Sequence, residues 1–258
     1  MEQRPGEDQR RETERRADRR RAQSRSFGVA AAAYERGRPS YPAAALDWLL
    51  PPGARRVLDL GAGTGKLTRS LVQRGLDVVA VEPTEGMRAQ FREVLPGVEL
   101  VAGTAEEVPL PDASADAALA AQAWHWVDPQ RAAPEVARVL RPGGTLGLLW
   151  NVRDAGVPWI ARLDRMLPQA GEEHLRSMAP VVGPPFGPVE RLDVTWTQVI
   201  TLEELMDLTA SRSWVITLEE PQRSAVLADV RTQAQERLDA VGVLEMAYVT
   251  RCSRTRRP

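Results

Sequence analysis

The sequence predicts a doubly wound α/β fold: a mostly parallel seven-stranded sheet with a helical cap and an antiparallel edge strand. Three observations predict it. Apolar runs of strand length alternate with amphipathic segments from residue 56 to residue 151, a glycine-rich turn joins the first such strand to a helix, and two late strands follow a helical region. Such alternation favours parallel strands with right-handed crossovers. Ligands of these sheets bind beyond the carboxyl ends of the strands.

Each element is predicted by its own pattern of apolar spacing. In the first part of the chain, strands are expected at 56–60, 76–83, 98–103, 115–124 and 145–151, with helices around 47–50, 66–72, 84–95 and 129–144. In the second part, helices are expected at 158–167, 201–214 and 224–241, and strands at 189–200 and 243–255. The helices of the second part would form a cap above the sheet, and its two strands would close one edge as an antiparallel pair.

The chain is expected to divide into three parts. Residues 1–25 contain almost no apolar side chains, so burial cannot offset their ordering entropy and a disordered or solvated charged tail is expected. Residues 26–150 form the ligand-binding core with an N-terminal covering helix. Residues 151–258 supply cap helices and closing strands that complete the same domain.

The composition excludes several classes of function. A formal net charge of -1 gives no general attraction to nucleic acid or acidic membranes, and no apolar run approaches membrane-spanning length. One cysteine, Cys252, and two histidines allow no internal disulfide and no cysteine or histidine metal cluster. We therefore expect a cytoplasmic, metal-free protein, a monomer or homodimer, whose partner is a small molecule rather than nucleic acid or membrane.

The turn "VLDLGAGTGKLTRSL" at residues 57–71 carries the first functional signal. A phosphate-binding P-loop is excluded, because its first glycine would fall on Leu60 and its hydroxyl on Leu67. A dinucleotide fingerprint requires its third glycine where Lys66 stands, which counts against that interpretation without excluding it. The G-x-G-x-G spacing suits a cofactor without a pyrophosphate, whose amino-acid end and ribose lie over the glycines. S-adenosylmethionine is such a cofactor.

Glu82 ends the second predicted strand, seventeen positions after Gly65. A carboxylate there can accept hydrogen bonds from both hydroxyls of a ribose. This role serves NAD and S-adenosylmethionine equally, so it does not separate the two.

The run "VLDLGAGTGKLT…VVAVEP…GTAEEVPLPDASAD…AAQAWHW…RVLRPGGTLGL" resembles the class I S-adenosylmethionine-dependent methyltransferases, type 11 branch, over residues 57–150. The resemblance implies a Rossmann-like fold, S-adenosylmethionine as cofactor and S-adenosylhomocysteine as product. It further implies that Gly61, Ala62 and Gly63 pass under the methionine portion of the cofactor and that Glu82 holds the ribose. Pro83 and Met87 would border the adenine, and Thr104, Ala105 and Glu106 would meet the adenine edge. Ala121 and Gln122 would lie near the methyl group. Many relatives carry Asp where Thr104 stands, and this Asp accepts a hydrogen bond from the adenine amino group. In this chain, Glu106 or a backbone carbonyl could accept that hydrogen bond instead.

The segments "FGVAAAAYERGRPSYP" and "HWVD" resemble a narrower group that includes trans-aconitate methyltransferases and related small-molecule enzymes. By this similarity Tyr34 and Arg38 fold over the cofactor, with Arg38 placed to pair with its carboxylate.

The chemistry of the acceptor depends on His125. In-line displacement on a sulfonium needs no base when the nucleophile is a carboxylate, whereas a phenol, an amine or a carbon acid needs one. His125 is a candidate base or orienting group. Further substrate-binding candidates are Trp124, Trp126, Trp159 and Arg153, the last with a salt bridge to Asp154 or Glu172 as its structural alternative.

Carboxylate O-methylation of a small acceptor is the preferred interpretation. The alternative is O-, N- or C-methylation of an aromatic natural product with His125 as base. More remote interpretations are a nicotinamide oxidoreductase and an inactive cofactor-binding regulator. A base-methylating nucleic-acid enzyme would carry [DN]-P-P-[YF] where "AQAWHW" stands.

Overall fold

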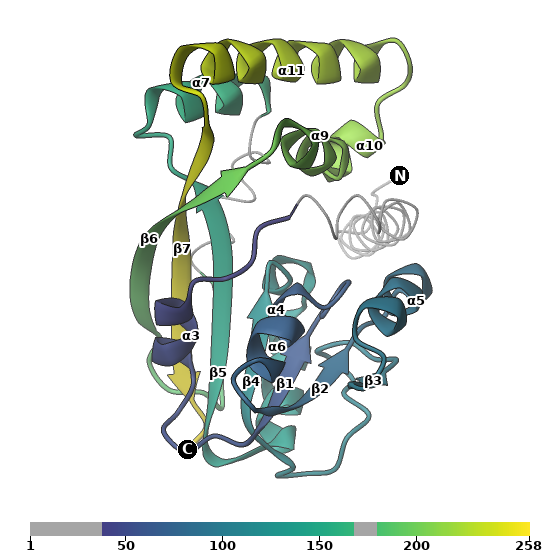
Figure 1. Ribbon diagram of the computed structural model, residues 1–258. Coiled ribbons are helices and arrows are strands. Elements are labelled where there is room, and N and C mark those ends of the chain that lie inside the picture. Colours follow the sequence, from purple (N-terminus) through teal and green to yellow (C-terminus); the bar gives the residue numbers. More distant parts are fainter. Residues whose placement is uncertain (1–37, 168–179) are drawn as a thin grey trace, which may run out of the picture.

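The computed structural model describes residues 38–167 and 180–258 (Figure 1). Its sheet has seven strands in the order β3-β2-β1-β4-β5-β7-β6. The strands are β1 (Arg56–Leu60), β2 (Asp77–Val81), β3 (Glu99–Val101), β4 (Ala115–Ala121), β5 (Leu140–Arg153), β6 (Glu190–Ile200) and β7 (Leu244–Arg256). Strands β1 to β5 pair in parallel, and β7 pairs antiparallel with both β5 and β6. The predicted fold class is confirmed, including the antiparallel pairing at one edge.

Helices cover both faces of the parallel part of the sheet. They are α3 (Ala43–Leu49), α4 (Lys66–Val72), α5 (Glu85–Val94) and α6 (Pro129–Val139). Successive residues of a strand point to opposite faces. Accordingly Val57 of β1 packs in a cluster with α3 and α4, whereas Leu58 packs in a cluster with α6. The near-continuous apolar run of β1 follows from this burial on both faces.

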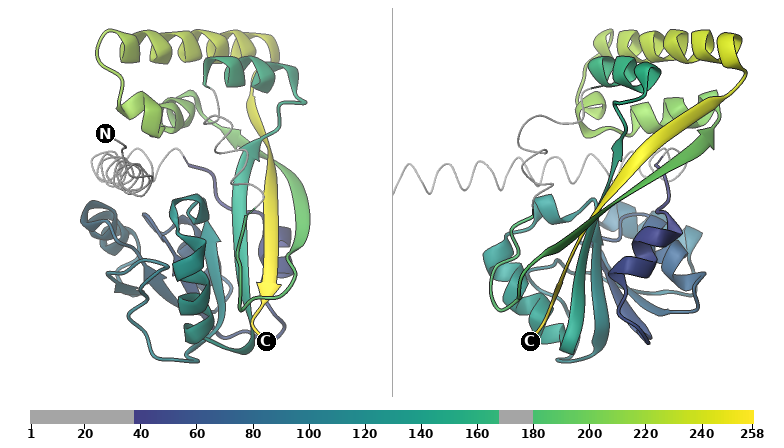
Figure 2. Two further views of the ribbon diagram at one scale, coloured as in Figure 1. Left: turned by 180° about the vertical axis from the view of Figure 1, so that it is seen from behind. Right: turned by 90° about the vertical axis from the view of Figure 1, so that its left-hand side faces the viewer.

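A cap lies beyond the carboxyl ends of the parallel strands (Figure 1). It consists of α7 (Pro158–Met166), α9 (Leu202–Ala210), α10 (Ser213–Ile216) and α11 (Gln222–Val241). These helices enclose a hydrophobic cluster of their own together with residues of β6 and β7, such as Ile200 and Met246. Figure 2 shows β6 and β7 running from the core into the cap. These long strands therefore connect the hydrophobic core of the sheet with the hydrophobic cluster of the cap.

Several predicted bounds differ from the structure, and the two largest differences concern helices. The helix expected at 129–144 ends at Val139, and β5 begins at Leu140, which pairs with Ala115 of β4. The helix expected at 201–214 is divided into α9 and α10 between Ala210 and Ser213. In the described ranges, no helix combines the length and apolar character needed to cross a membrane. The predicted tail at 1–25 and Tyr34 lie outside the described residues.

Candidate active site

The glycine turn joins β1 to α4 and brings two other segments against it. The N–H groups of Gly61 and Ala62 donate to the Val81 carbonyl at 2.8 and 3.1 Å. Gly61 has φ of +71°, and a Cβ there would lie 2.7 Å from the Cβ of Ala123. Gly63 has φ of +58°, and a Cβ there would meet nothing within 4 Å. Gly61 therefore allows a close approach, while Gly63 borders open space that a ligand can occupy.

Glu82 is 5% exposed and its carboxylate is oriented by two backbone donors. Oε2 accepts from the N–H of Gly63 at 2.9 Å, and Oε1 accepts from the N–H of Thr84 at 2.8 Å. Burial raises the pKa of Glu82, and these two hydrogen bonds act in the opposite direction. Arg88 of α5 donates to the carbonyls of Glu82 and Pro83 at 2.8 and 2.7 Å. The predicted ribose-binding carboxylate is thus tied directly to the glycine turn.

Asp59 is a candidate that sequence reasoning missed. It is fully buried, and its Oδ2 accepts from the Thr68 hydroxyl at 2.5 Å. Its Oδ1 is buried without a hydrogen-bond partner among the described residues. Burial raises the pKa of Asp59 to about 7, and the charge of Glu82 adds to the increase. The available signal was an acid inside the apolar strand "VLDL", since a buried carboxylate is retained only where something compensates it.

The expected adenine side lies between β3 and α6. Met87 and Ala105 are buried, and Pro83 is exposed. The backbone of Thr104 exchanges hydrogen bonds with that of Glu107 at 3.2 and 3.3 Å, so this turn closes on itself. Oε1 of Glu106 accepts from the N–H of Asp128 at 2.8 Å. Glu106 therefore links the turn to the segment after β4, and the contacts of these residues with adenine stay predictions.

Ala121 and Gln122 end β4, where the methyl group is expected. Gln122 has φ of +55°, a conformation that costs a residue other than glycine about 1–3 kcal/mol. Its N–H donates to the Leu149 carbonyl at 2.9 Å, and its Nε2 donates to the Asn151 carbonyl at 3.1 Å. These two bonds to β5 hold the strained residue beside the glycine turn.

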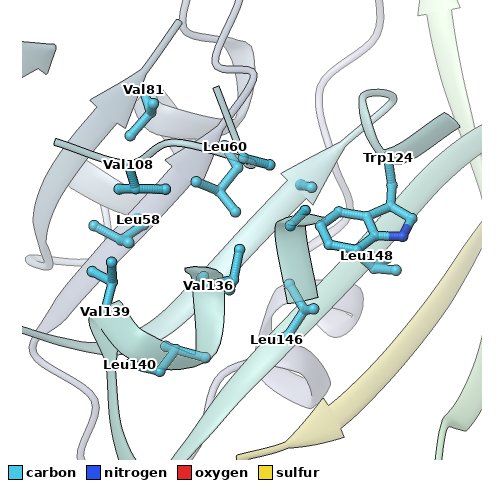
Figure 3. Packing of buried hydrophobic residues seen from close by; sticks show 14 of the residues in the cluster. Leu58, Leu60, Val81, Val108, Trp124, Val136, Val139, Leu140, Leu146 and Leu148 are labelled. Carbon is cyan, nitrogen blue, oxygen red and sulfur yellow. The ribbon is translucent and has the colours of Figure 1, made fainter. Parts of the chain in front are cut away.

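The three-residue helix η1 (Trp124–Trp126) follows β4. Trp124 is 4% exposed, and Figure 3 shows its indole beside Leu148 in the core cluster. Its Nε1 donates to the Val181 carbonyl at 3.1 Å. The ring of Trp124 belongs to the core cluster, and its contact with substrate stays a prediction.

His125 lies between two other tryptophans. The rings of His125 and Trp126 have centroids 4.7 Å apart and are tilted by 45°. Trp150 of β5 is fully buried, and its Nε1 donates to Nδ1 of His125 at 3.4 Å. The hydrogen bond fixes which imidazole nitrogen carries a lone pair.

Trp159 lies in the cap and Arg153 lies where β5 meets the cap, and their contacts with substrate stay predictions. Trp159 is 8% exposed in the hydrophobic cluster of the cap. Arg153 is 3% exposed, its Nε donates to Asp164 of α7, and its Nη2 donates to the Leu167 carbonyl at 2.6 Å. Because β5 continues into the cap, it delivers Arg153 to α7. Asp164, not Asp154, is the carboxylate bonded to Arg153 in the described part of the chain, and Glu172 lies outside that part.

Arg38 begins the described chain and contacts the cap. Its Nε and Nη2 donate to the hydroxyl and the carbonyl of Ser211, each at 3.3 Å. The same entry segment is held on the sheet, since Nδ2 of Asn151 donates to the Ser40 carbonyl at 2.9 Å. The pairing of Arg38 with a cofactor carboxylate stays a prediction.

Comparison with known proteins relates the chain to methyltransferases. A family model described as a methyltransferase domain matches residues 58–148. The chain is 53% identical over 237 residues to an uncharacterized methyltransferase of Mycobacterium tuberculosis, covering 91% of this chain and 97% of the relative. It is 33% identical over 240 residues to an uncharacterized methyltransferase-like protein of Schizosaccharomyces pombe, covering 88% and 93%.

Two further matches extend this relation. A malonyl-[acyl-carrier protein] O-methyltransferase of Methylococcus capsulatus is 40% identical over 133 residues, covering 47% of this chain and 48% of the relative. The solved structure of a proposed type II methyltransferase from Anaeromyxobacter dehalogenans has a TM-score of 0.66 and 28% identity, covering 85% and 97%. These comparisons support the enzyme class and its cofactor, not the narrower trans-aconitate-like group. The chain belongs to the class I S-adenosylmethionine-dependent methyltransferases.

Proposed function

We propose that this methyltransferase acts on a small-molecule acceptor and that the preferred nucleophile is a carboxylate oxygen. The observation that carries the proposal is the hydrogen bond from the buried Trp150 indole to Nδ1 of His125. The relative named malonyl-[acyl-carrier protein] O-methyltransferase is named for O-methylation, which agrees with an oxygen nucleophile.

The residues around the glycine turn fit S-adenosylmethionine, which when bound supplies a methyl group on a positively charged sulfur. Gly63 leaves space for the methionine portion, and Glu82 presents an oriented carboxylate for the ribose hydroxyls. Asp59 adds a buried carboxylate oxygen with an unused acceptor position, which suits the amino group of the cofactor. Gln122 would border the methyl group, because it follows β4 and its neighbour Ala123 lies against Gly61 of this turn.

The state of His125 follows from its neighbour. A buried indole N–H needs an acceptor, and Nδ1 of His125 provides it for Trp150. A neutral imidazole has one N–H and one lone pair, so the proton of His125 belongs on Nε2. Nε2 then acts as a hydrogen-bond donor. A donor can orient a carboxylate oxygen, whereas accepting a proton from a phenol, an amine or a carbon acid requires a lone pair.

The alternative is an aromatic acceptor with His125 as base. The tilted pair of His125 and Trp126 offers an aromatic surface on which a planar molecule could stack. Base catalysis through Nδ1, however, would break the bond to Trp150 and leave a buried N–H without an acceptor. This cost favours the carboxylate.

Tautomer and acceptor can be tested separately. Two-bond ¹H–¹⁵N correlation spectra of the protein bound to S-adenosylhomocysteine should show the Nε2–H form of His125, with a His174→Asn variant used for assignment. A mass-spectrometric screen with S-adenosylmethionine should find methyl esters of small carboxylic acids. His125→Asn, which keeps a donor, should retain most turnover. Methylation found only on phenols, amines or carbon acids, and lost in His125→Asn, would refute the proposal.

A further inference from the structure

Three arginines converge where the cap meets the end of β5. Arg212 precedes α10, Arg153 ends β5, and Arg38 contacts Ser211 beside Arg212. The charges of both other guanidiniums act on the pKa of Arg212, as do those of Tyr248 of β7 and Asp164 of α7. Asp164 is the one carboxylate coupled to Arg212 in the described part of the chain, and its oxygen is bonded to Arg153.

Among the described residues, Arg212 is the arginine of this group whose side chain makes no hydrogen bond. Its Nε is buried and makes no hydrogen bond among the described residues. Burial, and then the charges of Arg153 and Arg38, hold the pKa of Arg212 well below its usual range. Arg153, by contrast, is bonded to Asp164 and to the Leu167 carbonyl. Arg212 as a residue is half-buried, and a guanidinium whose Nε is buried without an acceptor is costly. A carboxylate matches the donor fork of a guanidinium in two parallel hydrogen bonds.

We propose that Arg212, supported by the positive charges of Arg38 and Arg153, forms a carboxylate-binding subsite that anchors an acid group of the methyl acceptor. The inference rests on the proposed function, because it assumes a small acceptor bound under the cap. It replaces Arg153, the arginine expected from the sequence, by one that comes from the loop between α9 and α10.

The register of the sheet indicates which group of the acceptor is anchored. Ala121, at the end of β4, pairs with Leu149 of β5, and Arg153 lies four residues further along that strand. At about 3.3 Å per residue, roughly 13 Å of strand separate the backbone of Leu149, beside the expected methyl position, from the backbone of Arg153. The anchored carboxylate is therefore not the group that receives the methyl. The acceptor class is a molecule with an acid group at one end and a nucleophile at the other, and a dicarboxylate meets this requirement.

The carboxylate of S-adenosylmethionine itself is the other source of the same chemistry, since Arg38 was expected to bind it. The two sources separate in a binding experiment on the full chain. Calorimetry would measure the affinity for S-adenosylhomocysteine, and then the affinity for succinate with S-adenosylhomocysteine saturating. The variant is Arg212→Gln, and the matched control is Arg191→Gln, an exposed arginine of β6. Neutral succinamide serves as the uncharged probe.

We expect succinate, but not succinamide, to bind the wild-type protein. In Arg212→Gln the dissociation constant for succinate should rise about tenfold or more, while that for S-adenosylhomocysteine stays unchanged. Arg191→Gln should match the wild type in both. Absence of succinate binding to the wild type, or equal binding by Arg212→Gln, would overturn the proposal. Weaker S-adenosylhomocysteine binding in Arg212→Gln would assign the arginine to the cofactor instead. Failure of the proposed function would show differently, as a screen in which no carboxylic acid is methylated.

Discussion

Replacing Asp59 by Asn should change how the stability of the protein depends on pH. The folded structure raises the pKa of Asp59 from 3.8 to about 7, chiefly by burial. The folded state then holds a proton that the unfolded chain has lost, so the free energy of unfolding falls as pH rises through this interval and is lowest above pH 7. The full interval corresponds to about 4 kcal/mol, and the part between pH 5 and pH 8 to about 3 kcal/mol.

Urea unfolding of both proteins at pH 5, 6, 7 and 8 measures this term. Asp59→Asn removes the titration, so its free energy of unfolding should gain about 3 kcal/mol relative to the wild type between pH 5 and pH 8. Asp229→Asn, at an exposed site on α11, should give a constant difference from the wild type. Saturating S-adenosylhomocysteine should reduce the gain, because its amino group would stabilise the ionised form of Asp59. A pH-independent difference for Asp59→Asn would refute the reasoning.

Two further outcomes follow from the same turn. Glu82→Gln should weaken S-adenosylhomocysteine binding about tenfold or more in calorimetry, because an amide offers one acceptor where the ribose needs two; unchanged affinity would remove this residue from the site. Gly61→Ala should lower the unfolding free energy by about 2 kcal/mol more than Gly75→Ala, since both have positive φ but only the first would clash with Ala123; equal losses in denaturant titrations would count against the close approach.

Most of the fold could be predicted because its signals are local. The alternating burial of β6 and the apolar runs of β1 and β2 appear directly in the sequence, and their bounds agree with the structure within a few residues. The end of α6 could not be predicted from "LRPGG", which is typical of a helix stop. Leu140 already pairs with Ala115, a contact that depends on the neighbouring strand.

In the candidate site, too, some features could be predicted from the sequence and others depend on tertiary contacts. Glu82 and the glycine turn were predicted separately, and a direct hydrogen bond between Glu82 and Gly63 joins them. The burial of Trp124 and Trp159 could not be predicted, because composition does not reveal which tryptophan rings fill cores. The ion pair of Arg153 could not be predicted, because its partner, Asp164, lies on a helix whose position depends on how far β5 extends.

The charges of the reaction explain why Arg212 and His125 belong in one proposal. When a carboxylate attacks a sulfonium, an anion and a cation become a neutral ester and a neutral thioether. A site that excludes water therefore destabilises the reactants more than the transition state, and a permanent positive charge next to the nucleophile would oppose the transfer. In the proposed mechanism, a neutral His125 with its proton on Nε2 would orient the nucleophile without adding such a charge. A second carboxylate keeps its charge throughout the reaction, and Arg212, in the cap between α9 and α10, would hold it away from the reacting atoms without slowing the chemistry. This separation predicts that Arg212→Gln raises the Michaelis constant for a dicarboxylate and leaves kcat nearly unchanged.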